Sequence, residues 1–295
     1  MLLDIAEDLE IKEDTLPPRK PPLKLHGIAG MPRAGSTLLC NILNQNSDFS
    51  ATSTDNLVGV LSSIIDTVSN AIEIKQQLHL NKKVTEDKIK ATLRGAIEGW
   101  NDHNTRIVFN KSREWPNRHQ LIRELYPNFK LVMMVRDLRG VLASTIKQHE
   151  KTPFFQLNTG DNILIDRYLN YVQNGGFIGT CAKYCCDMNR TDRPGVLFIR
   201  YEDLIKNPEA IMRAIYEFID EPYYEHHFED VRQTVAEVDS LYLNKYPHRG
   251  IGTIKDSEHN EWKQYVSNDI SELILSDWKF YCNLFGYSAG GPIFA

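Results

Sequence analysis

The chain has 295 residues, of which 42% are hydrophobic and 25% are charged. This balance is typical of a globular protein that buries a sizeable core. The formal net charge is −5 and the isoelectric point is about 6.0. Neither value indicates nucleic acid or an anionic membrane as a partner, although both are compatible with a local basic cleft for an anionic cofactor.

Cysteine usage and the N-terminal composition bear on the compartment. The five cysteines are odd in number and lack the spacing of a disulfide framework. Cys181, Cys185 and Cys186 lie in a helical pattern without a His pair, so buried thiols are favoured over a metal site. No apolar run reaches the roughly 20 residues that span a bilayer, and the acidic start does not resemble a signal peptide. We therefore expect a cytoplasmic protein without a metal site.

The predicted elements alternate between short apolar strands and helices. Residues 1–22 are polar and rich in proline, which predicts a flexible arm before a first strand that ends near Gly30. Further strands are predicted at residues 105–110, 129–135 and 196–200. Helices are predicted after Gly35, at 57–68, at 85–100, at 116–125, at 138–149, at 162–190 with an interruption at Gly175-Gly176, from Asn207-Pro208 onwards, and at 269–284. Residues 239–261 have the composition of a loop.

This alternation predicts the fold class. It indicates an α/β fold with three layers, in which helices flank a mostly parallel central sheet. Ligands of such folds bind at the carboxyl ends of the strands. The motifs described below each follow a predicted strand, so they are expected at that edge of the sheet.

The segment after the first predicted strand is typical of an anion-binding loop. Gly30 and Gly35 have the G-x-x-x-x-G spacing of a P-loop, but Ser36 stands where a nucleotide-hydrolysing P-loop has lysine. The cation comes earlier, at Arg33, after the turn residue Pro32. Loop amides and a helix N-terminus that converge here would hold a phosphate-like group. The alternative is a strand-turn-helix whose glycines serve the backbone alone.

Residues 32–38 resemble the 5′-phosphosulfate loop of the sulfotransferases, which use 3′-phosphoadenosine 5′-phosphosulfate (PAPS) as donor and release PAP. The bacterial and protein-tyrosine sulfotransferases are the nearest versions. The resemblance implies a P-loop-like fold, with one sulfotransferase domain over residues 23–288, a helical insertion at 56–101 near the acceptor site, and a tail at 289–295. It also implies that the 5′-phosphosulfate is bound by Arg33, Ala34, Gly35, Ser36, Thr37 and Leu38.

A second motif follows the strand predicted at 129–135. Arg136 stands at the strand end and Ser144 lies two turns into the next helix, and an arginine fork with a hydroxyl suits a phosphate monoester. The pair resembles the 3′-phosphate motif of sulfotransferases. Two alternatives stay open: Arg136 and Asp137 pair structurally, or Asp137 is the magnesium-binding Asp of a P-loop kinase.

Three further segments resemble family motifs. Lys111 matches the lysine that contacts the transferring sulfuryl group in protein-tyrosine sulfotransferases, and Tyr201 matches a tyrosine near the adenine. The loop with Arg249, Gly250 and Lys255 resembles in part the loop that closes over the 3′-phosphate. The alternatives are an ordinary surface lysine and a packing tyrosine at a strand end.

The general base is where the sequence departs from the family. Protein-tyrosine sulfotransferases have a Glu at about the position of Thr54, so the neighbouring Asp55 is our first candidate base. Cytosolic sulfotransferases have a His where Arg113 stands, which makes the adjacent Glu114 the second candidate. The alternative interpretation of Asp55 is a cap for the helix that follows.

Together, these motifs predict a PAPS-dependent sulfotransferase (EC 2.8.2 type) whose transfer is in-line and metal-independent. The acceptor is a small molecule or a peptide with a hydroxyl or amine, bound between the helices of 56–101 and the loop with Phe154 and Phe155. The alternatives are a P-loop kinase for a nucleotide or small molecule, and a non-catalytic nucleotide-binding protein. The sequence does not indicate an oligomeric state.

Overall fold

The computed structural model describes residues 23–53, 55–101, 105–151, 164–173, 175–190, 193–235, 252–254, 261–289 and 291–292. Several sequence predictions lie outside these residues. They are the N-terminal arm, the 152–162 loop with Phe154 and Phe155, most of the 239–261 loop, and the site residues Arg249, Gly250 and Lys255.

Five strands form one sheet, in which every pair of neighbours is parallel. The strands are β1 (Lys24–Gly30), β2 (Phe49–Thr52), β3 (Ile107–Lys111), β4 (Leu131–Val135) and β5 (Val196–Arg200), in the order β2-β3-β1-β4-β5. The chain passes from β3 on one side of β1 to β4 on the other, so the strand order reverses at β1. Ligands of open α/β sheets bind outside the carboxyl ends of the strands at such a point.

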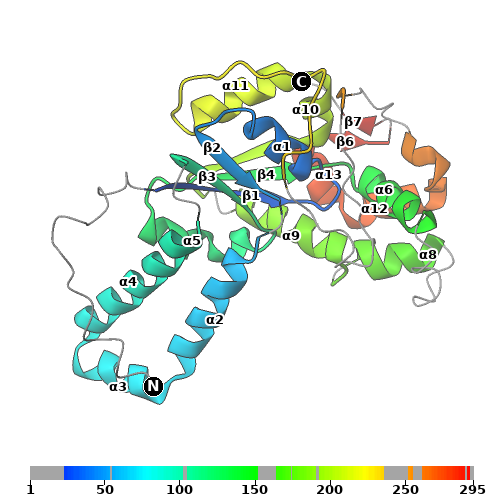
Figure 1. The fold of residues 1–295 in the computed structure, drawn as a ribbon. Helices are drawn as coiled ribbons and strands as arrows, with labels where there is room; N and C mark the ends of the chain where they lie inside the picture. The colour runs from blue at the N-terminus through cyan, green and yellow to red at the C-terminus, as the bar shows by residue number, and fades with distance from the viewer. Residues whose placement is uncertain are drawn as a thin grey trace.

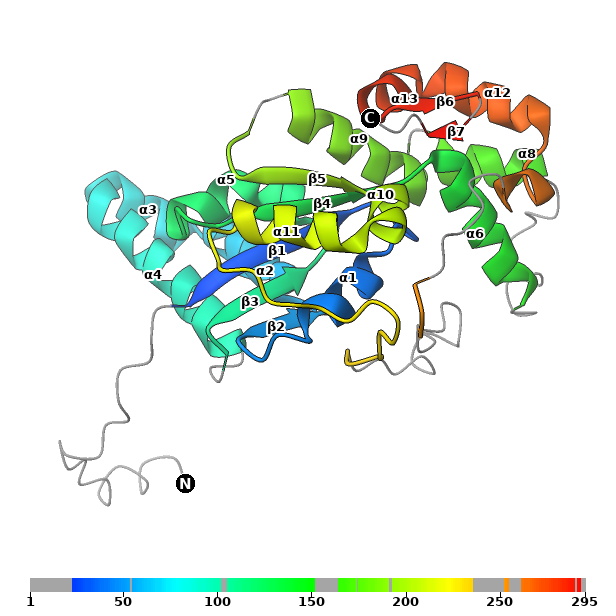
Figure 2. The same cartoon turned by 90° about the horizontal axis from the view of Figure 1, so that it is seen from above.

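Helices cover both faces of this sheet, which confirms the predicted fold class. On one face lie α1 (Ser36–Leu43), α10 (Tyr201–Lys206) and α11 (Pro208–Phe218), as Figures 1 and 2 show. On the other face lie α5 (Trp115–Leu125) and α9 (Phe177–Arg190) (Figure 1). All five residues of β4 are buried, as expected for a strand covered on both faces.

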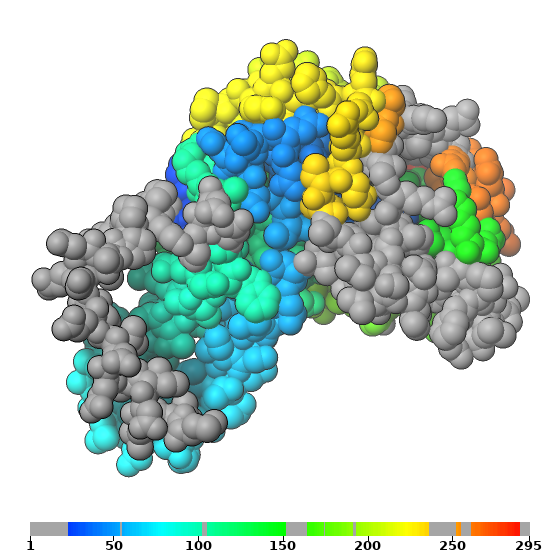
Figure 3. All heavy atoms as spheres, viewed as in Figure 1, coloured from blue at the N-terminus to red at the C-terminus, as the bar shows by residue number. Residues whose placement is uncertain are grey.

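The helical insertion predicted at 56–101 is an arm that projects from the sheet (Figures 1 and 3). It consists of α2 (Leu57–Asn70), α3 (Ile72–Leu80) and α4 (Lys82–Trp100). The last of these begins three residues before the predicted Thr85, because the Asn81 side chain accepts from the amide of Val84 and caps the helix. Among the described residues no single helix meets the length and hydropathy of a membrane span; α2 and α3 meet them only as a pair bent by 69°.

Two groups of elements pack beside the sheet. The first comprises α6 (Leu138–Glu150), α8 (Leu164–Arg167) and the π-helix η2 (Tyr168–Val172). The second is the C-terminal part of the chain, which comprises the 3₁₀ helix η4 (Glu261–Gln264), α12 (Asn268–Asp277), α13 (Lys279–Phe285), β6 (Tyr287–Ser288) and β7 (Gly291–Pro292).

The interruption predicted at Gly175-Gly176 is present between η2 and α9. Two other boundaries differ from the sequence prediction. The helix predicted at 269–284 is divided at Trp278, although it ends as expected before Gly286, whose φ of 72° closes α13. Strand β7 pairs with β6, so the predicted boundary at residue 289 falls inside this hairpin.

All five cysteines are described, buried and outside any disulfide, as their pattern predicts. Burial raises the pKa of the Cys181 thiol to about 11 and that of Cys282 to about 12. These thiols are therefore protonated at neutral pH and act as small apolar side chains.

The close approach of β1 to β4 requires a glycine at the end of β1. Gly30 has a φ of 111°, and a Cβ there would lie 2.0 Å from the carbonyl oxygen of Met134. Gly30→Ala should therefore reduce the free energy of unfolding by about 3 kcal/mol, since both the backbone conformation and the space exclude a side chain. Urea unfolding measures this loss.

Gly99→Ala is the matched control for this substitution. Gly99 is exposed in α4, and a Cβ there would meet nothing within 4 Å. Alanine should stabilise the protein by about 0.5–1 kcal/mol, because glycine is unfavourable inside a helix. A Gly30→Ala protein as stable as the wild type would show that β1 and β4 tolerate separation at this point.

Candidate functional site

The loop between β1 and α1 presents a helix N-terminus at the carboxyl edge of the sheet. Gly35 has a φ of 78° and is the N-cap of α1. Arg33 is also left-handed, with a φ of 59°, which costs a non-glycine residue about 1–2 kcal/mol. The first amides of a helix have no intrahelical acceptor, and the helix dipole places partial positive charge beside them. The loop is therefore suited to an anion.

The first and second sequence motifs are in direct contact. The Arg33 side chain donates from Nε to the Ser144 hydroxyl at 3.2 Å. The Arg136 guanidinium donates from NH1 to the Arg33 carbonyl oxygen at 2.6 Å. The residues that the sequence assigned to two different phosphate groups thus share one site, between the ends of β1 and β4.

Tyr201 joins this site from the end of β5. The Arg136 guanidinium lies over its ring, 4.2 Å from the centroid, a distance at which a cation is attracted to the ring face. On the loop side, a Cβ at Gly35 would lie 2.7 Å from Cδ2 of Tyr201. The ring therefore packs against the loop because residue 35 has no side chain.

Glycine also makes room for the Arg136 side chain. A Cβ at Gly140, in the first turn of α6, would lie 3.2 Å from Nε of Arg136. The guanidinium is thus held between this turn and the Tyr201 ring. A planar cation fixed in this way is well prepared to bind a phosphate with two parallel hydrogen bonds.

Lys111 approaches the loop from the end of β3. Its ammonium donates to the Thr37 hydroxyl at 3.4 Å, and Thr37 lies in the first turn of α1. Three cations and two hydroxyl groups therefore meet around one helix N-terminus, and the contacts that join them link residues 74 to 111 positions apart in the chain. This donor set fits a ligand that carries two phosphate-like groups.

Asp55 makes the capping contact that is the alternative interpretation of this residue. Its Oδ1 accepts from the amide of Leu57 at 2.7 Å and from the indole of Trp100 at 2.9 Å. Glu114 accepts from Asn117 at 2.7 Å. A catalytic role for either carboxylate stays a prediction.

Sequence reasoning missed a buried polar network beside Arg136. Arg139 is fully buried and pairs with Asp137, from NH2 to Oδ2 at 2.5 Å. Glu202 accepts from the amide of Asp137 at 3.1 Å. The hydroxyl of Tyr281 contacts the backbone of Arg136. Because Tyr281 lies 145 residues from Arg136, no local pattern could have indicated this contact.

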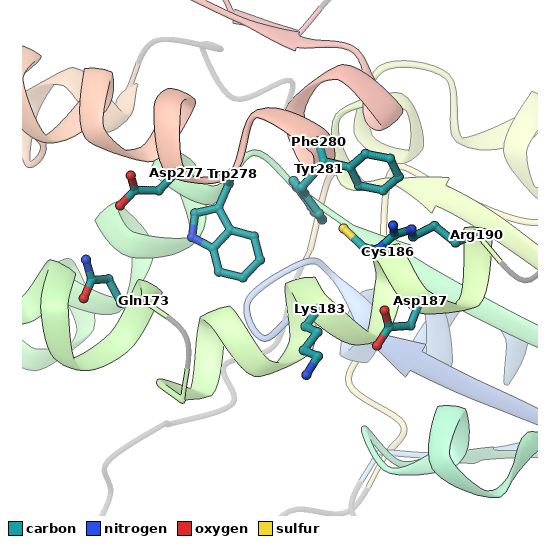
Figure 4. Close-up of a pocket in the computed structure, with 9 residues that line it drawn as sticks. All are labelled: Gln173, Lys183, Cys186, Asp187, Arg190, Asp277, Trp278, Phe280 and Tyr281. Carbon is teal, nitrogen blue, oxygen red and sulfur yellow. The ribbon is translucent and has the colours of Figure 1, made fainter.

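A separate cavity of about 600 Å³ lies between α9 and the junction of α12 with α13. Figure 4 shows Lys183, Asp187 and Arg190 of α9 along it, with Trp278 and Phe280 opposite. None of the sequence-predicted site residues is in its wall. No group of three or more His, Cys, Asp or Glu side chains among the described residues is arranged to hold a metal ion.

Known proteins with similar sequences are sulfotransferases. The chain is 26% identical over 208 residues to protein-tyrosine sulfotransferase A of Caenorhabditis elegans, which covers 66% of this chain and 50% of that protein. It is 28% identical over 270 residues to a putative protein-tyrosine sulfotransferase of Caenorhabditis briggsae, with 85% and 79% covered. The chain thus spans half the length of the first relative and about four fifths of the second.

Solved structures with a similar fold include two sulfotransferases. The sulfotransferase domain of the Synechococcus olefin synthase has a TM-score of 0.55 at 18% identity, over 92% of this chain and 98% of that one. A mouse sulfotransferase complexed with PAP has a TM-score of 0.53 at 10% identity, over 88% and 83%. The sulfotransferase family model matches residues 27–225, which include Arg33, Lys111, Arg136, Ser144 and Tyr201. The chain belongs to the sulfotransferase family.

Proposed function

We propose that this protein transfers a sulfuryl group from PAPS to a hydroxyl or amine of an acceptor. The observation that carries the proposal is the direct contact of Arg33 with both Ser144 and Arg136. In this arrangement one site can hold a 5′-phosphosulfate and a 3′-phosphate at the same time. The presence of PAP in the mouse sulfotransferase of similar fold supports this choice of donor.

The positions of the site residues suggest which part of PAPS each would bind. Arg136 and Ser144 would bind the 3′-phosphate, and the Tyr201 ring, between Arg136 and Gly35, would lie against the nucleoside. The amides at the start of α1 would hold the 5′-phosphosulfate. PAPS supplies a sulfuryl group that is already activated by its anhydride bond to phosphate.

Arg33 and Lys111 are the groups suited to the charge that develops during transfer. In-line transfer places charge on the equatorial oxygens and on the leaving phosphate. Fixed cations at those positions stabilise the transition state more than the ground state. Lys111 contacts Thr37 in the first turn of α1, and Arg33, in the loop before α1, contacts Ser144 of α6. Asp55 is the proposed base for the acceptor, with Glu114 as the second candidate.

The names of the relatives suggest the acceptor class. Protein-tyrosine sulfotransferases of several animals are similar to this chain, and so is carbohydrate sulfotransferase 1 of Danio rerio, at 26% identity over 57% of this chain. We therefore place a tyrosyl hydroxyl first and a sugar hydroxyl second.

Nucleotide binding tests the donor. Calorimetry without added metal should show PAP binding, and Arg136→Ala should weaken it at least tenfold, because a charge-assisted pair to the 3′-phosphate is lost. Arg213→Ala, on the exposed face of α11, is the control and should leave the affinity unchanged. ATP binding that requires magnesium, with PAP ignored, would instead establish a kinase.

Measurements of turnover test the proposed role of Lys111 in stabilising the transition state. With PAPS and a panel of tyrosine peptides and oligosaccharides, Lys111→Ala should lower turnover about 100- to 1,000-fold, as expected for one lost transition-state donor. PAP affinity should change less than threefold. Lys75→Ala, exposed on α3, is the control. Equal losses in turnover and PAP affinity would contradict a transition-state role, and a wild type that binds PAP but sulfates nothing would favour a non-catalytic protein.

A further inference from the structure

The turn that presents Arg136 is held by side chains from the C-terminal part of the chain. The amide of Arg136 donates to the Tyr281 hydroxyl at 3.3 Å, and the same hydroxyl donates to the Arg136 carbonyl oxygen at 2.9 Å. Tyr281 lies in α13 and is fully buried. One hydroxyl therefore holds both backbone polar groups of the residue that follows β4.

Glu202 holds the next residue of the same turn. Its Oε1 accepts from the amide of Asp137 at 3.1 Å, and its Oε2 accepts from the hydroxyl of Tyr287, in β6, at 3.0 Å. Glu202 and Tyr287 are 7% and 4% exposed. The carboxylate thus bridges the turn to the C-terminal hairpin, next to Tyr201 under the Arg136 guanidinium.

The Asp137 side chain is held from the same direction. It pairs with the buried Arg139, which also donates to the carbonyl oxygen of Ser288 at 2.7 Å and lies 4.5 Å from the ring centroid of Trp262. A buried ion pair of this kind loses its compensation if one partner moves. The start of α6 is therefore fixed to β6 and η4 as well as to α13.

These contacts have a functional consequence for Arg136. Its guanidinium makes a 2.6 Å bond to the Arg33 carbonyl oxygen and stacks on Tyr201, so its reach toward a ligand depends on where its backbone lies. Binding constellations tolerate displacements of only about 0.5 Å. Tyr281 and Glu202 hold the backbone of this turn at Arg136 and Asp137.

We infer that Tyr281 and Glu202 are positioning residues for Arg136 and set the affinity of the site for a 3′-phosphate. Tyr281 and its neighbours in η4, α13 and β6 lie beyond residues 27–225, where the family model matches. The C-terminal part of this chain would thus complete a donor site whose proposed anion ligands among the described residues, Arg33, Lys111, Arg136 and Ser144, lie in the matched region. The inference rests on the proposed function, because it takes Arg136 as the ligand of the 3′-phosphate.

Only the hydroxyl of Tyr281 contacts Arg136, so this contact can be removed without removing the ring. Phenylalanine keeps the ring packing against Phe285 and Tyr287 and removes only the hydroxyl that holds Arg136. Burial raises the pKa of this hydroxyl well above its usual value, so it keeps its proton for the Arg136 carbonyl at neutral pH.

The experiment compares two nucleotides that differ only in the 3′-phosphate. Dissociation constants for PAP and for 5′-AMP are measured by calorimetry on the full chain. Tyr281→Phe should weaken PAP binding about five- to tenfold and leave 5′-AMP binding unchanged, so that the 5′-AMP dissociation constant divided by the PAP dissociation constant falls. Glu202→Leu, which removes the acceptor for the Asp137 amide, should lower the ratio in the same way.

Tyr216→Phe is the matched control. Tyr216 is a buried tyrosine of α11 whose hydroxyl contacts Asn46 and His226 instead of the turn at Arg136. It should lose stability without a change in the PAP to 5′-AMP ratio. Melting temperatures of all variants separate stability from discrimination.

The two ways to fail are distinguishable. A wild-type protein that binds PAP no more tightly than 5′-AMP would overturn the proposed 3′-phosphate site and the inference with it. A wild type that discriminates, with unchanged ratios in both Tyr281→Phe and Glu202→Leu, would overturn the inference and leave the proposed function standing.

Discussion

The hydrogen bond from the Arg136 guanidinium to the Arg33 carbonyl oxygen is the contact on which the site depends. It joins the residue after β4 to the loop after β1. The acceptor, Arg33, has a left-handed backbone conformation, which is unfavourable for a residue with a side chain. A backbone in an unfavourable conformation persists only where its surroundings fix it. Here the acceptor carbonyl is aimed at a charged donor, and that donor is itself held by Tyr201 and by the turn that Tyr281 secures.

The parallel sheet explains why such distant segments meet. The carboxyl ends of β1, β3, β4 and β5 lie at one edge, so the residues just after each strand converge there. Glycine then sets the distances. Gly30 lets β1 approach the backbone of Met134, and Gly35 lets the Tyr201 ring contact the loop. Packing at these two positions fixes the geometry of the candidate anion site.

Local patterns predicted the parts of this arrangement that depend on neighbouring residues. The loop at 30–38, the strand before Arg136, and the Asn207 cap of α11 could all be recognised because their signals span a few residues. Strand β2 was missed because four residues carry little periodicity. Tyr281, Glu202 and Arg139 were not predicted as a group because their contacts depend on how α13, α10 and α6 pack. From the sequence, Arg33 and Ser144 could be expected to lie near each other. Their hydrogen bond could not be predicted, because it depends on the tertiary fold.

The Asp55 carboxylate can cap helix α2 and still be available as the proposed general base. Both contacts of this side chain, with the Leu57 amide and the Trp100 indole, engage Oδ1. They link the start of α2 to the end of α4 and therefore orient the Asp55 carboxylate where the helical insertion joins the rest of the protein. A base role would use Oδ2, which these two contacts do not engage. Capping then supplies the orientation that proton transfer needs, because a base is effective only at hydrogen-bond distance from the proton it removes. The bond of Arg118 to Ser62, at 3.0 Å, fixes α2 against α5 nearby, so the arm and the sheet are held together where the acceptor is proposed to bind.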